Sequence, residues 1–258
     1  MLYFISFIFG ASIGSFVQVV VTRLNVAPII KARSKCLSCG EVLRAFDLMP
    51  VISYIFLKGK CRYCKSAYGI SNLLIEVIYG LVFVGLYHFI LANQFSGYDV
   101  LIYLFYYSVL FITLGVMTMY DYNHTYIPIS YLFTYCILTF GMLIVRYVSD
   151  PTIINLLAPI IVASPFLIVW LVTKGRGIGF GDVLLFLGIG AFFGLEGGLA
   201  VLLVSIWSGA IVGIIIYILR RRNNIKSTVI PFVPFIVFAF LFVLFSGIDI
   251  FSISNLFA

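Results

Sequence analysis

Long apolar segments, several of them close to 20 residues, constrain this chain more than any other feature of its sequence. In a bilayer the backbone polar groups must be satisfied within the chain, so such a segment predicts a membrane-spanning helix. The composition agrees, because 63% of the residues are hydrophobic and only 10% are charged. The segments lack the alternation of polar and apolar residues that an outer-membrane barrel requires. They fall at 2–22, 70–92, 99–119, 128–148, 152–172, 183–194, 197–219 and 229–246.

The sequence therefore predicts an all-α polytopic membrane protein with about eight transmembrane helices, within a range of six to eight. The count depends on 183–194, which is short for a full span and is tilted, re-entrant or continuous with the segment after it. We divide the chain into a first transmembrane helix at 1–22, a loop at 23–68 that contains four cysteines, and a transmembrane core at 69–258.

The basic residues predict the orientation of the chain in the membrane. Nine Lys or Arg residues but only two acidic residues lie between Arg23 and Lys65. By the positive-inside rule this loop is cytoplasmic, and alternation puts the turns at 120–127, 173–182 and 220–228 on the same side. The basic loop also suits anionic lipid headgroups, so membrane lipid is an expected partner. We find no nucleic-acid-binding motif in the sequence.

Four of the five cysteines form two C-x-x-C pairs, "CLSC" at 36–39 and "CRYC" at 61–64. Two such pairs offer the four thiolates that a structural Zn²⁺ site uses, and a metal would help so short a loop to fold. The predicted metal ligands are Cys36, Cys39, Cys61 and Cys64. The alternative is a set of redox-active or unligated thiols. Four protein ligands leave no open coordination position, so the predicted zinc is structural.

Two aspartates stand out because acidic residues are rare in the apolar segments. Asp121 follows one segment and Asp182 begins another, and the predicted topology puts both near the cytoplasmic face. Two facing carboxylates can share a proton, so that one acts as a base and the other as an acid, as in aspartic proteolysis. In "GIGFGD" at 177–182, Gly179 and Gly181 leave room for a substrate backbone. The alternative for these glycines is a flexible turn between helices.

Two rival functions come from other classes. A small ion-coupled transporter would use the aspartates as coupling groups, but it predicts acidic residues near the middle of the bilayer. A membrane scaffold would use the zinc loop to dock a partner, and it gives no reason for the paired carboxylates.

Several motifs together resemble the type IV prepilin peptidases, membrane aspartyl proteases with a GxGD motif. "GFGD" at 179–182 resembles that motif, and "DYNHTYIP" at 121–128 resembles the family's first aspartate followed by Ile-Pro. "GASIGSFVQVVVTRL" at 10–24 resembles the family's N-terminal helix, and the stretch at 33–64 resembles its cysteine loop. Glu76 matches an acidic residue that follows the loop.

The resemblance implies catalytic roles for Asp121 and Asp182 in cleaving the leader peptide of a prepilin or pseudopilin. Cleavage would occur at the cytoplasmic face of a bacterial inner or plasma membrane. The resemblance also implies N-methylation of the new N-terminus from S-adenosylmethionine, with Glu76 linked to this second activity. The segment 69–258 would then be the peptidase core, and the loop at 23–68 would belong to the methyltransferase.

Overall fold

The structure, a computed structural model, describes residues 1–24, 26, 28, 33–36, 38–93, 97–222 and 230–248, with the backbone alone at 220–222. The chain forms two compact units, Met1–Ile112 and Thr113–Ala258. Most of the predicted cytoplasmic turn at 220–228 lies outside the described residues.

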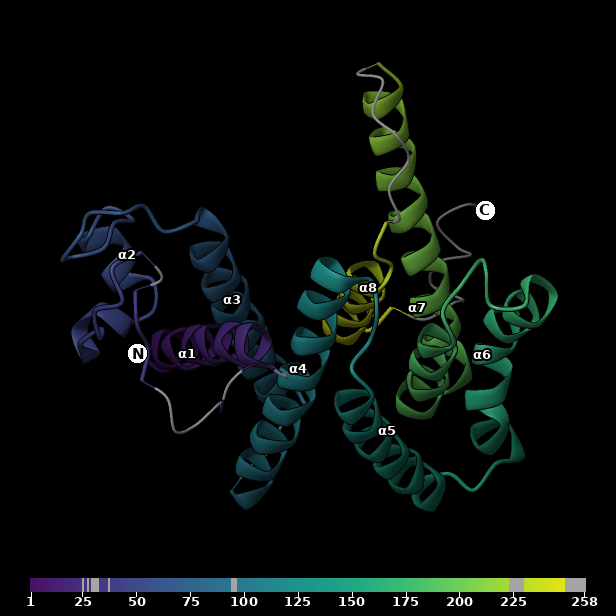
Figure 1. Cartoon of the computed structure of the whole chain (residues 1–258). Helices are drawn as coiled ribbons and strands as arrows, with labels where there is room; N and C mark the ends of the chain where they lie inside the picture. Colours follow the sequence, from purple (N-terminus) through teal and green to yellow (C-terminus); the bar gives the residue numbers. More distant parts are fainter. Residues whose placement is uncertain are drawn as a thin grey trace. The chain divides into compact units, whose positions relative to one another are not determined.

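Helices make up nearly all of the regular structure in the described ranges (Figure 1). They are α1 (Leu2–Arg23), η1 (Ala45–Leu48), α2 (Ile52–Phe56), α3 (Ile70–Ala92), α4 (Tyr98–His124), α5 (Ile129–Ser149), α6 (Ile153–Thr173), α7 (Phe180–Arg222) and α8 (Val233–Ser246). Six of these helices, α1 and α3 to α7, are long and apolar enough to cross a membrane. The prediction of an all-α polytopic membrane protein is confirmed, whereas the short helices η1 and α2 were not predicted.

In the first unit, α1 packs along α3 at two glycines of α1. A Cβ on Gly10 would lie 2.5 Å from the Tyr79 carbonyl oxygen, and one on Gly14 would lie 2.9 Å from the Tyr79 Cβ. The Tyr79 hydroxyl donates to the Phe111 carbonyl of α4 at 3.0 Å, so one tyrosine joins α3 to its two neighbours.

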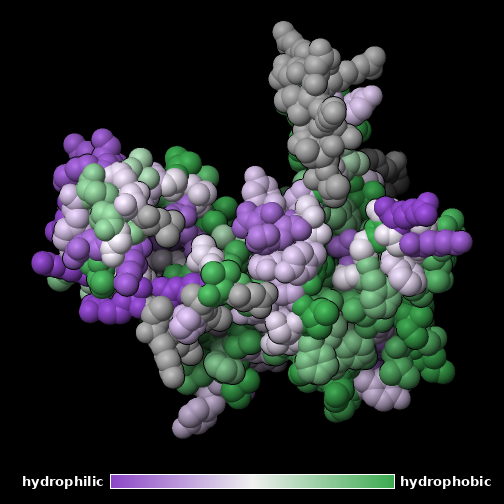
Figure 2. Space-filling view, viewed as in Figure 1, coloured by the Kyte–Doolittle hydropathy of each residue, from purple (hydrophilic) through white to green (hydrophobic). Residues whose placement is uncertain are grey.

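In the second unit, α5 shows how these helices meet both protein and lipid. Its inward positions follow the helical period: Leu132, Tyr135, Thr139 and Leu143. Many of its exposed positions are also large and apolar, among them Ile129, Phe133, Ile137 and Ile144. A helix that is apolar on every side does not face water, and hydrophobic residues dominate the visible surface over α5 and α6 (Figure 2).

Helix α7 is interrupted at Gly194, where φ is 76° and ψ is −163°. Only glycine adopts this backbone conformation without strain. Without the break, the 43 residues of α7 would be about 65 Å long, twice the thickness of a bilayer core. The halves 180–193 and 195–222 correspond to the predicted segments at 183–194 and 197–219, so each of the eight apolar segments matches a helix or half of one.

The two halves of α7 fold back on each other. Gly190 and Gly198 would be about 12 Å apart in an uninterrupted helix. Instead, a Cβ on Gly198 would lie 3.4 Å from the Gly190 Cα and 2.8 Å from the Val162 side chain of α6. The backbone of α6 also comes within 2.7 Å of a Cβ built on Gly190. Small residues therefore allow a close three-way crossing of α6 with both halves of α7.

Arg146 of α5 holds the break in α7. Its Nη2 donates to the Phe192 carbonyl at 2.6 Å, two residues before the break. A Cβ on Gly194 would collide with Nη1 of the same guanidinium. A side chain at residue 194 would therefore both strain the backbone and displace the arginine.

We expect Gly194→Ala to lower the stability of the protein by about 1–3 kcal/mol, because alanine cannot adopt this backbone conformation without strain. Thermal unfolding of the detergent-solubilised protein would show this as a lower Tm. The matched control is Gly141→Ala in α5, where a Cβ would meet nothing within 4 Å and where alanine favours the helix. Equal Tm values for the two variants would contradict the role of Gly194.

Candidate functional site

Asp121 is buried near the end of α4, with 7% of its surface exposed. Its Oδ2 accepts a hydrogen bond of 3.1 Å from the backbone N–H of Val233, the first residue of α8. The first N–H groups of a helix have no partner within the helix, and the helix dipole favours a negative charge beside them. The N-terminus of α8 thus holds the carboxylate in place.

Asp182 occupies the first turn of α7 and is partly buried. Its backbone N–H donates to the Gly179 carbonyl at 3.1 Å, which closes the turn that leads into the helix. The two aspartates that the sequence predicted as a pair both belong to the second unit, and both line one cavity there.

Both aspartates line a cavity of about 1030 Å³ within the second unit. The other walls come from the turn after α4, from α5, α6 and both halves of α7, and from the segment before α8. These walls are mostly apolar, and they include the stacked rings of Phe166 and Phe232, whose centroids are 5.7 Å apart. An apolar cavity with a few convergent polar groups is the usual form of a binding site.

The glycines of the "GIGFGD" turn also line this cavity. A Cβ on Gly181 would lie 2.9 Å from Ile127 Cδ1, so this glycine lets the turn pack against the segment after α4. A Cβ on Gly179 would make only an ordinary contact, at 3.6 Å, with Asp182 Oδ2. The approach of a substrate backbone past Gly179 and Gly181 stays a prediction.

The four predicted ligands in the loop come together: the Sγ atoms of Cys36, Cys39, Cys61 and Cys64 lie within 4.8 Å of one another. In a tetrahedral site with Zn–S bonds of about 2.3 Å, the sulfur atoms are about 3.8 Å apart. The Cys36 and Cys64 Sγ atoms are 3.8 Å apart. The cluster thus fits a tetrahedral metal ion.

The two C-x-x-C segments have the same backbone pattern. In one, Cys36 N–H donates to Glu41, and in the other, Cys61 N–H donates to Ser66, each five residues further on. Gly40 and Lys65 occupy equivalent positions with positive φ, at 74° and 60°. Backbone N–H groups of Cys39 and Ser38 lower the pKa of the Cys36 thiol to about 6. This geometry therefore favours a thiolate at Cys36, the form that binds a metal.

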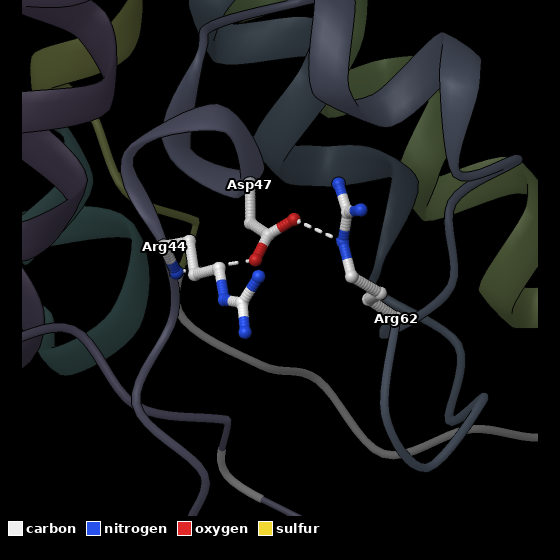
Figure 3. Close-up of polar contacts among 3 residues, drawn as sticks. All are labelled: Arg44, Asp47 and Arg62. Atoms are coloured by element: carbon white, nitrogen blue, oxygen red, sulfur yellow. Dashed lines mark hydrogen bonds and ion pairs between the residues drawn. The ribbon is translucent and has the colours of Figure 1, made fainter.

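An ion pair links the segment between the two cysteine pairs to the second pair (Figure 3). Arg62 Nε donates to Asp47 Oδ1 at 2.7 Å, and the Arg44 backbone N–H donates to the other carboxylate oxygen at 3.1 Å. Asp47 is buried, whereas Arg62 is about half exposed. The carboxylate therefore fixes η1 against the turn that carries Cys61 and Cys64.

Glu76 of α3 holds the loop at a strained point. Its Oε2 accepts a hydrogen bond of 2.8 Å from the backbone N–H of Val51. Val51 has a φ of 62°, which is unfavourable for a β-branched residue. Glu76 thus joins α3 to the start of α2, within the first unit.

The sequence did not reveal several parts of these sites. No local signal identified the Val233 N–H as the partner of Asp121, or Val51 as the partner of Glu76. The segment "DYNHTYIP" pointed to Asp121, but not to the lining role of Tyr126. These contacts join residues that are distant in the chain or depend on how a turn is folded.

The helices and the cavity between them define a multi-pass membrane protein. Comparison with known families agrees: a model described as the bacterial peptidase A24 N-terminal domain matches residues 8–90, and one described as the type IV leader peptidase family matches residues 108–214. The chain belongs to the type IV leader peptidase family.

Curated relatives are similar over most of this chain. A protein of Myxococcus xanthus is 27% identical over 86% of the chain, and the match spans 65% of that relative, just under two thirds. A protein of Pseudomonas putida is 28% identical over 92% of the chain and 88% of its own length. A protein of Pseudomonas aeruginosa is 28% identical over 89% of the chain and 85% of its own length. All three are named prepilin leader peptidase/N-methyltransferase. No solved structure matches the chain significantly.

We expect the purified, reduced protein to contain one zinc ion per chain, measured by elemental analysis. The double substitution Cys36→Ser and Cys61→Ser should abolish this content, because it removes one ligand from each C-x-x-C pair. A chelator should also make the loop more sensitive to protease, since metal binding contributes to folding. Cys136→Ser, in α5, is the control and should leave the zinc content unchanged. A wild-type protein without zinc would contradict the metal site.

Proposed function

We propose that this protein is a membrane aspartic endopeptidase that removes the leader peptide of prepilins or pseudopilins. Asp121 and Asp182 are the proposed catalytic residues. The observation that carries the proposal is that these two carboxylates line one cavity with mostly apolar walls. Membership of the leader peptidase family and the names of the relatives support the same activity.

The proposed reaction is hydrolysis of a peptide bond by the aspartate pair. One carboxylate takes a proton from a water molecule while the water oxygen attacks the scissile carbonyl, and the protonated partner donates to the carbonyl oxygen. The resulting intermediate breaks its C–N bond, and a proton passes to the leaving amine. Two carboxylates are sufficient for this sequence of proton transfers.

The chemistry of the cavity suits a substrate with an apolar segment beside the cleavage site. Apart from the aspartates, its walls are mostly apolar or aromatic. A prepilin, as the resemblance describes it, presents a short basic leader, a glycine and then an apolar helix. The apolar helix would occupy such a cavity, and the charged leader would remain outside the bilayer.

We place the four-cysteine loop and both aspartates on the cytoplasmic side of a bacterial inner or plasma membrane. The support is the concentration of basic residues between Arg23 and Lys65. Structural Zn²⁺ in the loop would hold the two C-x-x-C segments together. The rival function, an ion-coupled transporter, has no comparable support from the relatives.

A methyltransferase activity is the second part of the proposal, favoured by the names of the relatives. S-adenosylmethionine would supply the methyl group for the new N-terminal amine. Glu76 would act by position, because it holds the strained Val51 and thereby the loop against α3. The segments 23–68 and 69–258 would then carry methylation and proteolysis respectively.

We expect Asp121→Asn and Asp182→Asn each to lower the rate of prepilin cleavage by about 1000-fold or more, because neither amide can exchange the proton. The measurement is processing of a co-expressed prepilin, followed by gel shift in isolated membranes. Asp150→Asn is the matched control, because Asp150 is exposed between α5 and α6 and does not line the cavity. Wild-type cleavage by either cavity variant would refute the mechanism.

Mass spectrometry of the mature prepilin tests methylation separately. We expect the wild-type product to carry one added methyl group at its N-terminus. Glu76→Ala should reduce methylation but leave cleavage intact, because it frees Val51 without touching the aspartates. Glu76→Gln should restore methylation in part, since its amide oxygen still accepts from the Val51 N–H. If the wild-type protein yields only unmethylated product, the proposed methyltransferase activity is wrong.

A further inference from the structure

The cavity contains few polar groups that could bind a peptide backbone. The only lining residues with a charged group or a hydroxyl are Asp121, Asp182, Thr125 and Tyr126, counted over the part of the chain that the structure describes. A peptide that unwinds for cleavage exposes N–H and C=O groups, and leaving them unpaired in an apolar cavity is costly. A neutral hydroxyl in the wall could satisfy one of them.

Thr125 is already engaged in ending α4. Its φ of 57° is left-handed, and its backbone N–H donates to the Asp121 carbonyl at 2.8 Å. Its hydroxyl donates to the His124 carbonyl at 2.7 Å, so its proton is used within the turn. The sharp turn at Thr125 brings the next residue, Tyr126, back against the end of α4.

Tyr126 packs on Tyr120 and hydrogen-bonds to it. The two rings meet edge to face with centroids 5.0 Å apart, and the hydroxyl oxygens are 2.8 Å apart. The Tyr120 ring also packs against the His124 ring, with centroids 4.5 Å apart. Tyr120 is 5% exposed, whereas Tyr126 is 52% exposed and lines the cavity. One hydroxyl is therefore buried, and the other can reach a ligand.

We propose that the Tyr126 hydroxyl donates a hydrogen bond to a backbone carbonyl of the peptide substrate, with Tyr120 positioning it. Each hydroxyl carries one proton and two acceptor lone pairs. When Tyr120 donates to Tyr126, the Tyr126 proton remains for the substrate. Tyr120 is a positioning residue in this arrangement, because it reaches the substrate only through Tyr126. The inference rests on the proposed peptidase function and adds a substrate-binding residue to it.

The test measures kcat and KM with a synthetic prepilin-like peptide, a basic leader followed by glycine and an apolar segment, in mixed micelles. Tyr126→Phe keeps the ring and removes the hydroxyl, so we expect KM to rise by about tenfold. A hydrogen bond made equally to bound substrate and transition state changes KM and leaves kcat unchanged. Tyr122→Phe is the matched control, because this exposed tyrosine of α4 does not line the cavity and should change neither value.

Tyr120→Phe provides a second, independent variant. We expect a smaller rise in KM, about twofold to threefold, because the Tyr126 hydroxyl loses its orientation but remains present. The double variant should be no worse than Tyr126→Phe alone, since the two residues act as one unit. Such non-additivity would not arise from two separate packing defects.

The outcomes separate this inference from the proposed function. If the wild-type protein does not cleave the peptide, the peptidase function fails. If it does cleave and Tyr126→Phe has the wild-type KM, the Tyr126 inference alone is overturned. A lower kcat at unchanged KM in Tyr126→Phe would also overturn it. A raised KM in Tyr126→Phe, with no change in Tyr122→Phe, supports it.

Discussion

The break in α7 at Gly194 is the constraint on which the second unit depends. Because the chain turns back there, the first half of α7 can place Asp182 at the cavity while the second half contributes Ile206 to the same cavity. The guanidinium of Arg146 holds the Phe192 carbonyl beside the break. In a bilayer, where water cannot satisfy a carbonyl group, such a side-chain donor stabilises an interrupted helix.

The candidate active site is built from helix ends rather than from helix faces. Asp121 lies near the end of α4 and binds the first N–H of α8, and Asp182 lies in the first turn of α7. Helix N-termini favour negative charge, so two carboxylates can line one mostly apolar cavity. The same arrangement leaves the turn at Thr125 and Tyr126 free to form part of the cavity wall.

The loop of the first unit is too short to bury a large hydrophobic core, so other interactions must stabilise it. The four thiols replace a core at one end, and the Asp47–Arg62 pair fixes the segment between them. Glu76 of α3 then joins the loop to this helix through the Val51 N–H. Polar contacts therefore stabilise the loop, whereas apolar packing stabilises the arrangement of the helices.

The helical class, the apolar segments, the four-cysteine cluster and the pair of aspartates could all be predicted from the sequence. These follow from segment length, composition and spacing, which are local properties of the chain. The break in α7 at Gly194, the hydrogen bond from Val233 to Asp121 and the hydrogen bond between Tyr120 and Tyr126 became visible only in the folded chain. The first and third depend on how a break or a turn is folded, and the second joins residues more than 100 positions apart. Hydrophobic patterning does not predict such contacts, because it shows which residues avoid water but not which residues contact one another.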